Sequence, residues 1–155
     1  MKAIKNLSII LPIYNGEFFL KDAVQSILDQ SWLPQDFEIL LMDDASNDNS
    51  VEVARSLERV SKAIKLIALE KNGGVAYARN KGVQEARYEH LAFLDQDDTW
   101  HPRKLELQQS GIKSFMELDY VLGRQSFSLY QVDQPPKWLN PIWLEEPQKG
   151  WVPGT

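Results

Sequence analysis

The sequence predicts an α/β fold with a mostly parallel sheet flanked by helices. Short β-branched apolar runs alternate with helical patterns, the connections between them are short, and 155 residues suffice for one domain. The chain has no cysteine, which excludes disulfides, thiol nucleophiles and zinc–thiolate sites. Its net charge of −5 argues against a nucleic-acid binder, so no nucleic-acid partner is expected.

Four short apolar runs are expected to form the strands of the sheet. They span residues 7–12, 37–42, 64–69 and 90–94. The first of these runs is β-branched and brief, as is typical of a buried parallel strand. Two further runs, at 120–122 and 127–130, suggest additional strand segments.

Helical patterns fill the intervals between these runs. Apolar residues at helical spacing predict a helix over 17–30, and a helix with small residues on one side is expected over 75–86. Residues 44–50 are rich in capping side chains, so another helix should start there. Its expected buried stripe consists of Val53, Ala54, Leu57 and Val60. A fourth helix is expected to begin near His101, whose own role stays undecided.

The chain becomes rich in proline and tryptophan after about Asp133. We assign residues 1–125 to the α/β domain and residues 126–155 to an irregular segment rich in proline and tryptophan, since prolines interrupt regular backbone hydrogen bonding. No apolar run is long enough to span a bilayer and no signal peptide is recognisable, so a cytoplasmic location is expected. Peripheral association with the inner membrane surface stays open.

Polar side chains follow each of the four main predicted strands. They form the clusters 14–16, 43–44, 71–73 and 95–98. Because the carboxyl ends of parallel strands meet at one edge of a sheet, and open α/β sheets bind ligands there, these clusters predict a ligand site.

Asp95, Asp97 and Asp98 place three carboxylates within four residues. Such a group repels itself unless a cation or hydrogen-bond donors are present. Hard divalent ions such as Mg²⁺ or Mn²⁺ take oxygen ligands, often one or two carboxylates together with substrate phosphates. The alternative is a surface turn whose carboxylates cap the helix near His101.

The other clusters each allow two interpretations. One carboxylate of the pair Asp43 and Asp44 is expected either to contact a base or ribose or to cap the following helix. Tyr14 suits stacking on a base and the side-chain amide of Asn15 suits orienting the loop, but an ordinary turn is the alternative. The turn formed by Lys71, Asn72, Gly73 and Gly74 is expected to place free N–H groups at a helix start, where phosphates bind well. Arg79, farther along that helix, is expected either to reach the acidic cluster or a diphosphate, or to stay a solvated or salt-bridged surface residue.

Taken together, these stretches resemble the family 2 glycosyltransferases. The matching segments occur in the order and at the spacings of that family, over roughly residues 7–107, and they are 8–15, 26–31, 37–46, 72–82 and 93–98. The resemblance implies a Rossmann-like A-type glycosyltransferase fold. It makes residues 1–125 a nucleotide-sugar-binding domain, and it implies the N-terminal part of a truncated domain.

The resemblance also implies roles for individual residues. Those expected to bind the nucleotide are Pro12, Tyr14, Asn15, Asp44, Asn72, Gly73, Arg79 and Asp95. Asp97, with Asp95, is expected to hold Mg²⁺ or Mn²⁺, and Asp98 should lie in the sugar–phosphate region. The metal would neutralise the diphosphate leaving group.

The implied function is inverting transfer from a nucleotide-diphosphate sugar to a glycan, lipid or protein acceptor, in cell-wall or polysaccharide biosynthesis. In such enzymes a carboxylate base activates the acceptor. The catalytic base is expected in a missing acceptor-binding half, so this chain itself is expected to lack part of the machinery. The alternative is a catalytically inactive nucleotide-binding or interaction module on the same fold. An uncovered sheet edge would favour a homo-oligomer.

Overall fold

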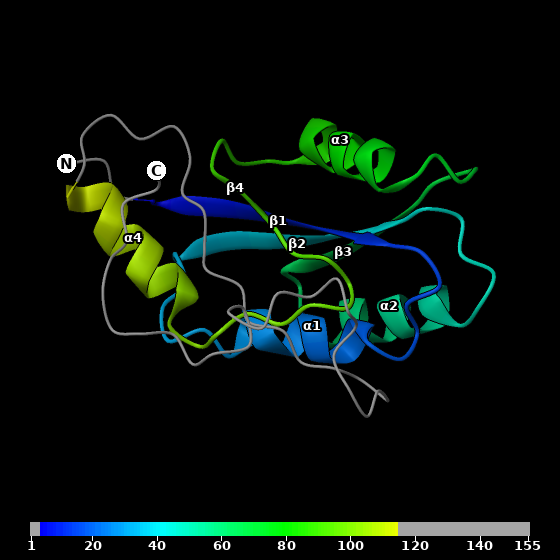
Figure 1. The fold of residues 1–155 in the computed structure, drawn as a ribbon, viewed down its shortest axis with the longest axis horizontal. Helices are drawn as coiled ribbons and strands as arrows, with labels where there is room; N and C mark the ends of the chain where they lie inside the picture. Colours follow the sequence, from blue (N-terminus) through cyan, green and yellow to red (C-terminus); the bar gives the residue numbers. More distant parts are fainter. Residues whose placement is uncertain (1–3, 115–155) are drawn as a thin grey trace, which may run out of the picture. The chain divides into compact units, whose positions relative to one another are not determined.

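The computed structural model describes residues 4–114, and the strand segments expected at 120–122 and 127–130 and the irregular segment 126–155 lie outside this range. The described chain alternates strands and helices as the sequence predicted (Figure 1). The elements are β1 (Asn6–Ile13), α1 (Leu20–Leu28), β2 (Asp36–Asp43), α2 (Ser50–Val60), β3 (Ile64–Ala68), α3 (Val75–Glu85), β4 (Leu91–Phe93) and α4 (Lys104–Ser114).

The strands form one parallel sheet in the order β3-β2-β1-β4. Ile10 of β1 stands opposite Leu40 on one side and opposite Phe93 on the other. β1 and β2 therefore occupy the centre, which explains why their sequences are almost continuously apolar. The predicted parallel sheet is confirmed.

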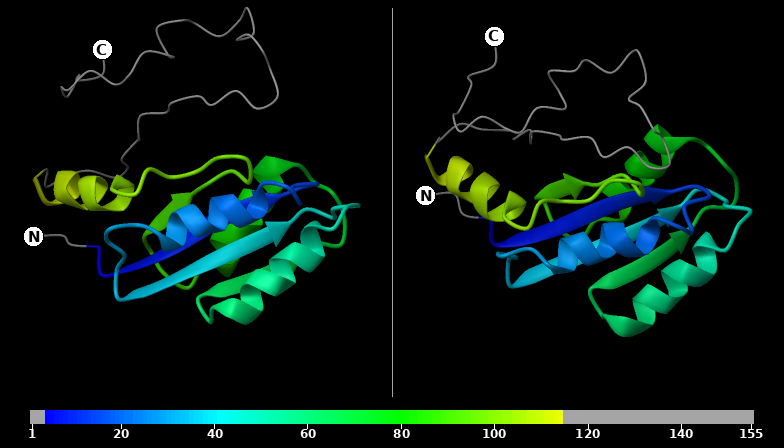
Figure 2. Two further views of the ribbon diagram at one scale, coloured as in Figure 1. Left: turned by 90° about the horizontal axis from the view of Figure 1, so that it is seen from below. Right: turned by 60° about the horizontal axis from the view of Figure 1, so that its bottom comes forward.

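Helices cover both faces of the sheet (Figures 1 and 2). Alternate residues of β1 point to opposite faces: Ile9 belongs to the core that includes α1 and α2, whereas Ile10 packs in the core beneath α3. Figure 1 shows α3 above the sheet and α1 and α2 below it. The prediction of a sheet flanked on both faces is therefore confirmed.

α3 approaches the sheet closely because its inward side carries small residues. Ala78 and Gly82 are buried there. A Cβ atom at Gly82 would lie 2.5 Å from Cγ2 of Ile10 and 3.2 Å from Cγ of Met42. α3 can lie this close to the sheet only because residue 82 has no side chain. This close packing fixes the distance of the N-terminal end of α3 from the ends of the strands.

The predicted buried stripe of α2 is wrong at one end. Ala54 is buried and Leu57 is partly buried against the core, but Val60 is 81% exposed. Val60 is the last residue of the helix, and the chain leaves it in an extended conformation at Ser61. No following turn covers the Val60 side chain, although its spacing continues the apolar pattern.

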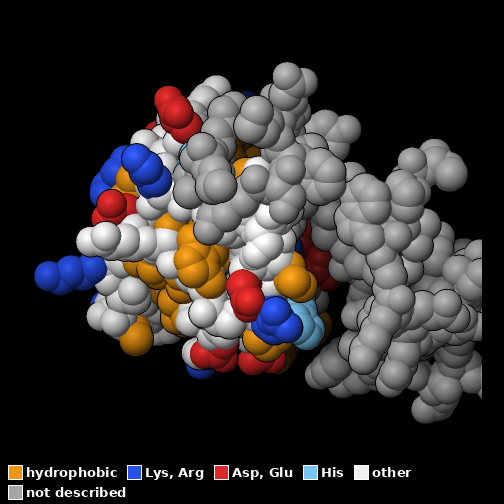
Figure 3. All heavy atoms as spheres, turned by 90° about the vertical axis from the view of Figure 1, so that its left-hand side faces the viewer, with side chains coloured by type: hydrophobic (Ala, Val, Ile, Leu, Met, Phe, Trp, Pro, Cys, Tyr) orange, Lys and Arg blue, Asp and Glu red, His pale blue; other side chains and the backbone are white. Residues whose placement is uncertain are grey.

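Figure 3 shows the molecule from the side on which the strands begin, opposite the polar clusters. Acidic, basic and apolar side chains are interspersed on the part of that surface that is described. Within residues 4–114, no helix is long and apolar enough to cross a membrane.

Candidate functional site

The loops at the carboxyl ends of the strands surround one pocket of about 360 Å³. Six of the residues expected at the site line it: Pro12, Tyr14, Asp44, Asn72, Asp95 and Asp97. Gln96 also lines the pocket, as does the start of α3 at Gly74, Val75 and Ala78. A concave site that combines an apolar wall with a few polar groups is the usual form of a small-molecule pocket.

Asn15 joins the loop after β1 to the loop after β2. Its N–H donates to Oγ of Ser46 at 3.0 Å, and its Oδ1 accepts the N–H of Asn47 at 2.8 Å. Asn15 has a φ of 51°, a left-handed conformation that asparagine tolerates well. Its side chain therefore orients the loop, as suggested above, and does not line the pocket.

Asp48 and Glu17 strengthen the same junction. Asp48 accepts the Glu17 N–H at 3.2 Å, and Glu17 accepts both the backbone and side-chain N–H groups of Asn49. Partial burial raises the pKa of Asp48, but hydrogen bonds from the Ser50 hydroxyl, the Ser50 N–H and the Glu17 N–H outweigh it and lower the pKa. The capping residues of 44–50 thus begin α2 and also hold a neighbouring loop.

Asp44 caps a helix that is not the next one along the chain. Its side chain is buried, and its two oxygens accept the N–H groups of Gly73 at 2.9 Å and of Gly74 at 2.7 Å. These amides lie at the start of α3, where a negative charge is favourable. The capped helix is thus α3 and not α2. The amides of Gly73 and Gly74, expected to be free for phosphate, are occupied by this carboxylate.

Arg79 connects α3 to the acidic cluster. Its Nη2 contacts Oδ1 of Asp95, and both side chains are partly exposed. Arg79 therefore reaches the cluster and also forms a partly exposed salt bridge, so these two of its expected alternatives coincide. One of the three carboxylates therefore has a fixed cationic partner.

Within residues 4–114, no ion pair with a second cation balances the remaining charge of the cluster. Asp97 is exposed at the pocket, and the Asp98 N–H closes a turn onto the carbonyl oxygen of Asp95 at 3.1 Å. Burial raises the pKa of Asp98, and the neighbouring carboxylates of Asp97 and Asp95 raise it further. The expected mutual repulsion is therefore present.

Two carboxylates at the pocket fit a hard divalent cation that shares its coordination with a ligand. Among the described residues, no group of three histidine, aspartate or glutamate side chains is arranged to hold a metal by itself. Mg²⁺ commonly takes only one or two carboxylates and completes its coordination with waters and phosphate oxygens. The donor set of Asp95 and Asp97 suits that kind of site.

His101 provides the cap at the start of α4. Its Nδ1 accepts the N–H of Arg103 at 3.2 Å, and its carbonyl oxygen accepts the N–H of Lys104 at 2.9 Å. The undecided histidine is therefore structural, and it occupies the capping position that the alternative interpretation gave to the carboxylates of the cluster.

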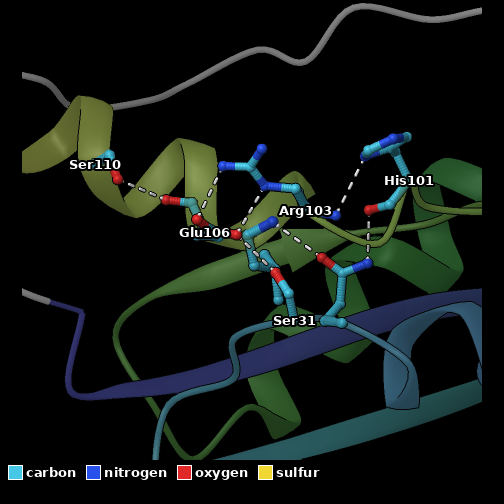
Figure 4. A network of polar contacts seen from close by, with 7 residues as sticks. Ser31, His101, Arg103, Glu106 and Ser110 are labelled. Carbon is cyan, nitrogen blue, oxygen red and sulfur yellow. Dashed lines mark hydrogen bonds and ion pairs between the residues drawn. The ribbon is translucent and has the colours of Figure 1, made fainter.

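Polar residues near the end of α1 hold the segment that follows the acidic cluster, and sequence reasoning assigned them no role. Ser26 accepts the Trp100 N–H at 3.0 Å, and Gln30 donates to the His101 carbonyl oxygen at 2.8 Å and accepts the Leu105 N–H at 3.0 Å. Figure 4 shows Ser31 continuing this contact to Glu106, which also pairs with Arg103. The sequence signal that could have indicated this role is the position of these polar side chains directly beside the apolar stripe of α1.

Comparison with known proteins identifies the family. The sequence profile described as glycosyl transferase family 2 matches residues 8–149. The chain belongs to this family. TuaG of Bacillus subtilis (strain 168), named for teichuronic acid biosynthesis, is 35% identical over 130 residues, which are 84% of this chain and 50% of TuaG. The poly(ribitol-phosphate) β-N-acetylglucosaminyltransferase TarP of Staphylococcus aureus (strain N315) is 35% identical over 66% of this chain and 31% of TarP.

A solved structure confirms the predicted A-type glycosyltransferase fold. S. aureus TarS 1–349 in complex with UDP-GlcNAc superposes with a TM-score of 0.64 at 28% identity, over 70% of this chain and 31% of that one. The 155-residue chain thus spans half or less of the length of these relatives.

Proposed function

We propose that the pocket is the donor site of an inverting family 2 glycosyltransferase and binds a nucleotide-diphosphate sugar together with Mg²⁺ or Mn²⁺. The observation that carries the proposal is the shared pocket: an aromatic ring and a proline on the β1 side face two carboxylates on the β4 side. A nucleoside suits the first surface, and a metal-bound diphosphate suits the second.

The β1 side would hold the base. Tyr14 is exposed to the pocket and offers a flat ring, Pro12 adds an apolar wall, and Asn72 brings a side-chain amide from the loop before α3. Asp44 lines the same region, but its two oxygens already accept backbone N–H groups. Its role toward a base would therefore use the remaining lone pairs of those oxygens.

The β4 side would hold the diphosphate and the sugar. We assign Asp97 as the main metal ligand because it is exposed at the pocket, and Asp95 as a second one through the oxygen that does not face Arg79. Asp98 would lie toward the sugar. When bound, the metal supplies positive charge that stabilises the diphosphate as a leaving group.

TarS provides independent support for the donor class, since it was solved with UDP-GlcNAc. The names of TuaG and TarP favour an acceptor among cell-wall glycans or polyol phosphates. A cytoplasmic location, as expected from the sequence, belongs to the same proposal. The base that activates the acceptor hydroxyl is not assigned to any residue of 4–114.

Calorimetry of the 155-residue chain with UDP, with and without Mn²⁺, tests the proposal. We expect Mn²⁺ to strengthen UDP binding, and Asp97→Asn to remove most of that gain, on the order of tenfold to a hundredfold in Kd. Asp36→Asn is the matched control. Asp36 is an exposed aspartate at the start of β2, and the pocket lies at the other end of the strands. If the unmodified chain and Asp97→Asn each bound UDP equally well with and without Mn²⁺, the metal-assisted donor site would be contradicted.

A second assay separates an enzyme from a binding module that lacks turnover. Release of GlcNAc from UDP-GlcNAc above background, lost in Asp97→Asn, would show donor activation by this chain. Tight UDP binding without release would leave the family 2 chain as the donor-binding part alone.

A further inference from the structure

Gln96 lies between the carboxylates of the acidic cluster, but its side chain turns toward the opposite wall of the pocket. Its Oε1 accepts the N–H of Tyr14 at 2.8 Å, and its Nε2 donates to the carbonyl oxygen of Tyr14 at 2.9 Å. One side chain therefore pairs with both backbone groups of one residue, across 82 positions of sequence.

The primary amide of Gln96 is complementary to both backbone groups of Tyr14. The backbone of Tyr14 offers one donor and one acceptor, and a primary amide presents the complementary acceptor and donor at one end. A glutamate could still accept the Tyr14 N–H, but its second oxygen would face the Tyr14 carbonyl oxygen without a proton between them. An alanine would make neither contact.

Gly16 leaves the space that the Gln96 side chain occupies. A Cβ atom at position 16 would lie 2.3 Å from Oε1 of Gln96 and 2.6 Å from its Cδ. The backbone of Gly16 is held by its own hydrogen bonds: its N–H donates to Oγ of Ser50 at 2.8 Å, and its carbonyl oxygen accepts from the start of α1. A larger residue at position 16 would therefore displace Gln96.

We infer that Gln96 is a positioning residue that sets the separation between the base side and the diphosphate side of the donor pocket. It fixes Tyr14 relative to its own neighbours Asp95 and Asp97, so that one ligand can contact both walls. This role rests on the proposed function. It predicts that losing the Gln96 side chain weakens the binding of ligands that contact both walls more than the binding of ligands that contact one wall.

The test compares UDP with uridine on the 155-residue chain, both in the presence of Mn²⁺. Gln96→Ala should raise the Kd for UDP about tenfold, as expected for two lost hydrogen bonds, and should change the Kd for uridine by less than about threefold. Gln96→Glu should weaken UDP binding at least as much. Gln84→Ala removes the same kind of side chain from an exposed position of α3 and should leave both affinities unchanged.

Gly16→Ala provides an independent route to the same defect. Because the added methyl group displaces Gln96, this variant should reproduce the selective loss of UDP affinity. Added to Gln96→Ala, it should cause little further loss, because the contact is already absent.

The outcomes separate this role from the proposed function. If the unmodified chain binds UDP and Gln96→Ala binds it equally well, the positioning role is wrong and the donor site stands. Equal losses for UDP and uridine, or additive losses in the double variant, also overturn the role, because they indicate general damage to the loop. If the unmodified chain binds no UDP, the proposed function fails and this role fails with it.

Discussion

Arg79 of α3 and Asp95 of the loop after β4 are in direct contact at the edge of the pocket. Their contact closes a ring of side-chain hydrogen bonds that joins the four loops. The other members of the ring are the pairs Asn15–Ser46, Asp44–Gly73 and Gln96–Tyr14. Each loop is thus held by both of its neighbours, so the pocket is largely preformed before any ligand binds.

Replacing Arg79 should affect binding more than stability. The two side chains are 38% and 41% exposed, and ion pairs this exposed contribute at most about 1 kcal/mol because water screens them. We expect Arg79→Met to lower the free energy of unfolding by less than about 1 kcal/mol. We also expect it to weaken UDP–Mn²⁺ binding about tenfold, since Asp95 loses its orientation. Urea denaturation and calorimetry measure the two effects.

Lys65→Met is the matched control for this prediction. Lys65 of β3 pairs with Glu85 at the end of α3, at 3.6 Å and with similar exposure, but away from the pocket. Its loss should leave UDP affinity unchanged. If the two variants changed UDP affinity equally, the effect would come from net charge and not from the orientation of Asp95.

The strands and the location of the site could be predicted from sequence because both follow from local patterns. β1 and β2 are buried on both faces, so Ile9, Ile10, Ile39 and Leu40 form apolar runs that no other element of this length would need. Once the strands were placed as parallel, the polar residues behind them had to meet at one edge.

The partners of the polar residues could not be predicted, because they depend on the paths of loops far apart in sequence. Asp44 was expected to cap α2 or contact a ligand, yet it accepts N–H groups 29 and 30 residues away. Gln96 stands inside the acidic cluster 95–98, and its position there predicts no contact with Tyr14. In both cases the side chain bonds to backbone groups, whose positions follow from tertiary structure and leave no trace in the composition of a motif.

Two glycines that look equivalent in the sequence should respond oppositely to alanine. Gly82 and Gly111 both lie inside helices, where alanine is normally favoured by about 0.5–1 kcal/mol. At Gly82, however, the new methyl group would meet the buried side chain of Ile10. We expect Gly82→Ala to lower the free energy of unfolding by about 1–2 kcal/mol, because overpacking outweighs helix propensity.

Gly111→Ala should raise the free energy of unfolding by about 0.5–1 kcal/mol, since no atom of residues 4–114 lies within 4 Å of the added Cβ. Urea denaturation of both variants gives the comparison. A gain in stability at both positions would show that α3 can move away from the sheet, and would remove the argument that close packing fixes its N-terminal end.

Lys104 should make the free energy of unfolding increase with pH in the alkaline range. Burial lowers the pKa of Lys104 to about 8, from 10.5 in the unfolded chain. Below pH 8 both states carry the proton, and the folded state bears the full cost of the buried charge. Between pH 8 and 10.5 the unfolded state binds more protons than the folded state, so stability rises with pH. After discounting for partial exposure, we expect a rise of about 1–2 kcal/mol.

Lys104→Met isolates this contribution, because other groups also titrate in that range and remain in the variant. The ammonium group lies 4.1 Å from the centroid of the Trp100 ring and 2.9 Å from Oε1 of Gln108, and both contacts favour the charged form. Both contacts oppose the effect of burial on the pKa of Lys104. The size of the pH-dependent change in stability therefore depends on how strong they are. Urea denaturation of both proteins at pH 7.5 and pH 10 should give a difference in unfolding free energy that grows with pH in favour of the lysine. A difference that stayed constant would mean that the ring and the amide compensate the charge fully, and that Lys104 titrates at its ordinary pKa.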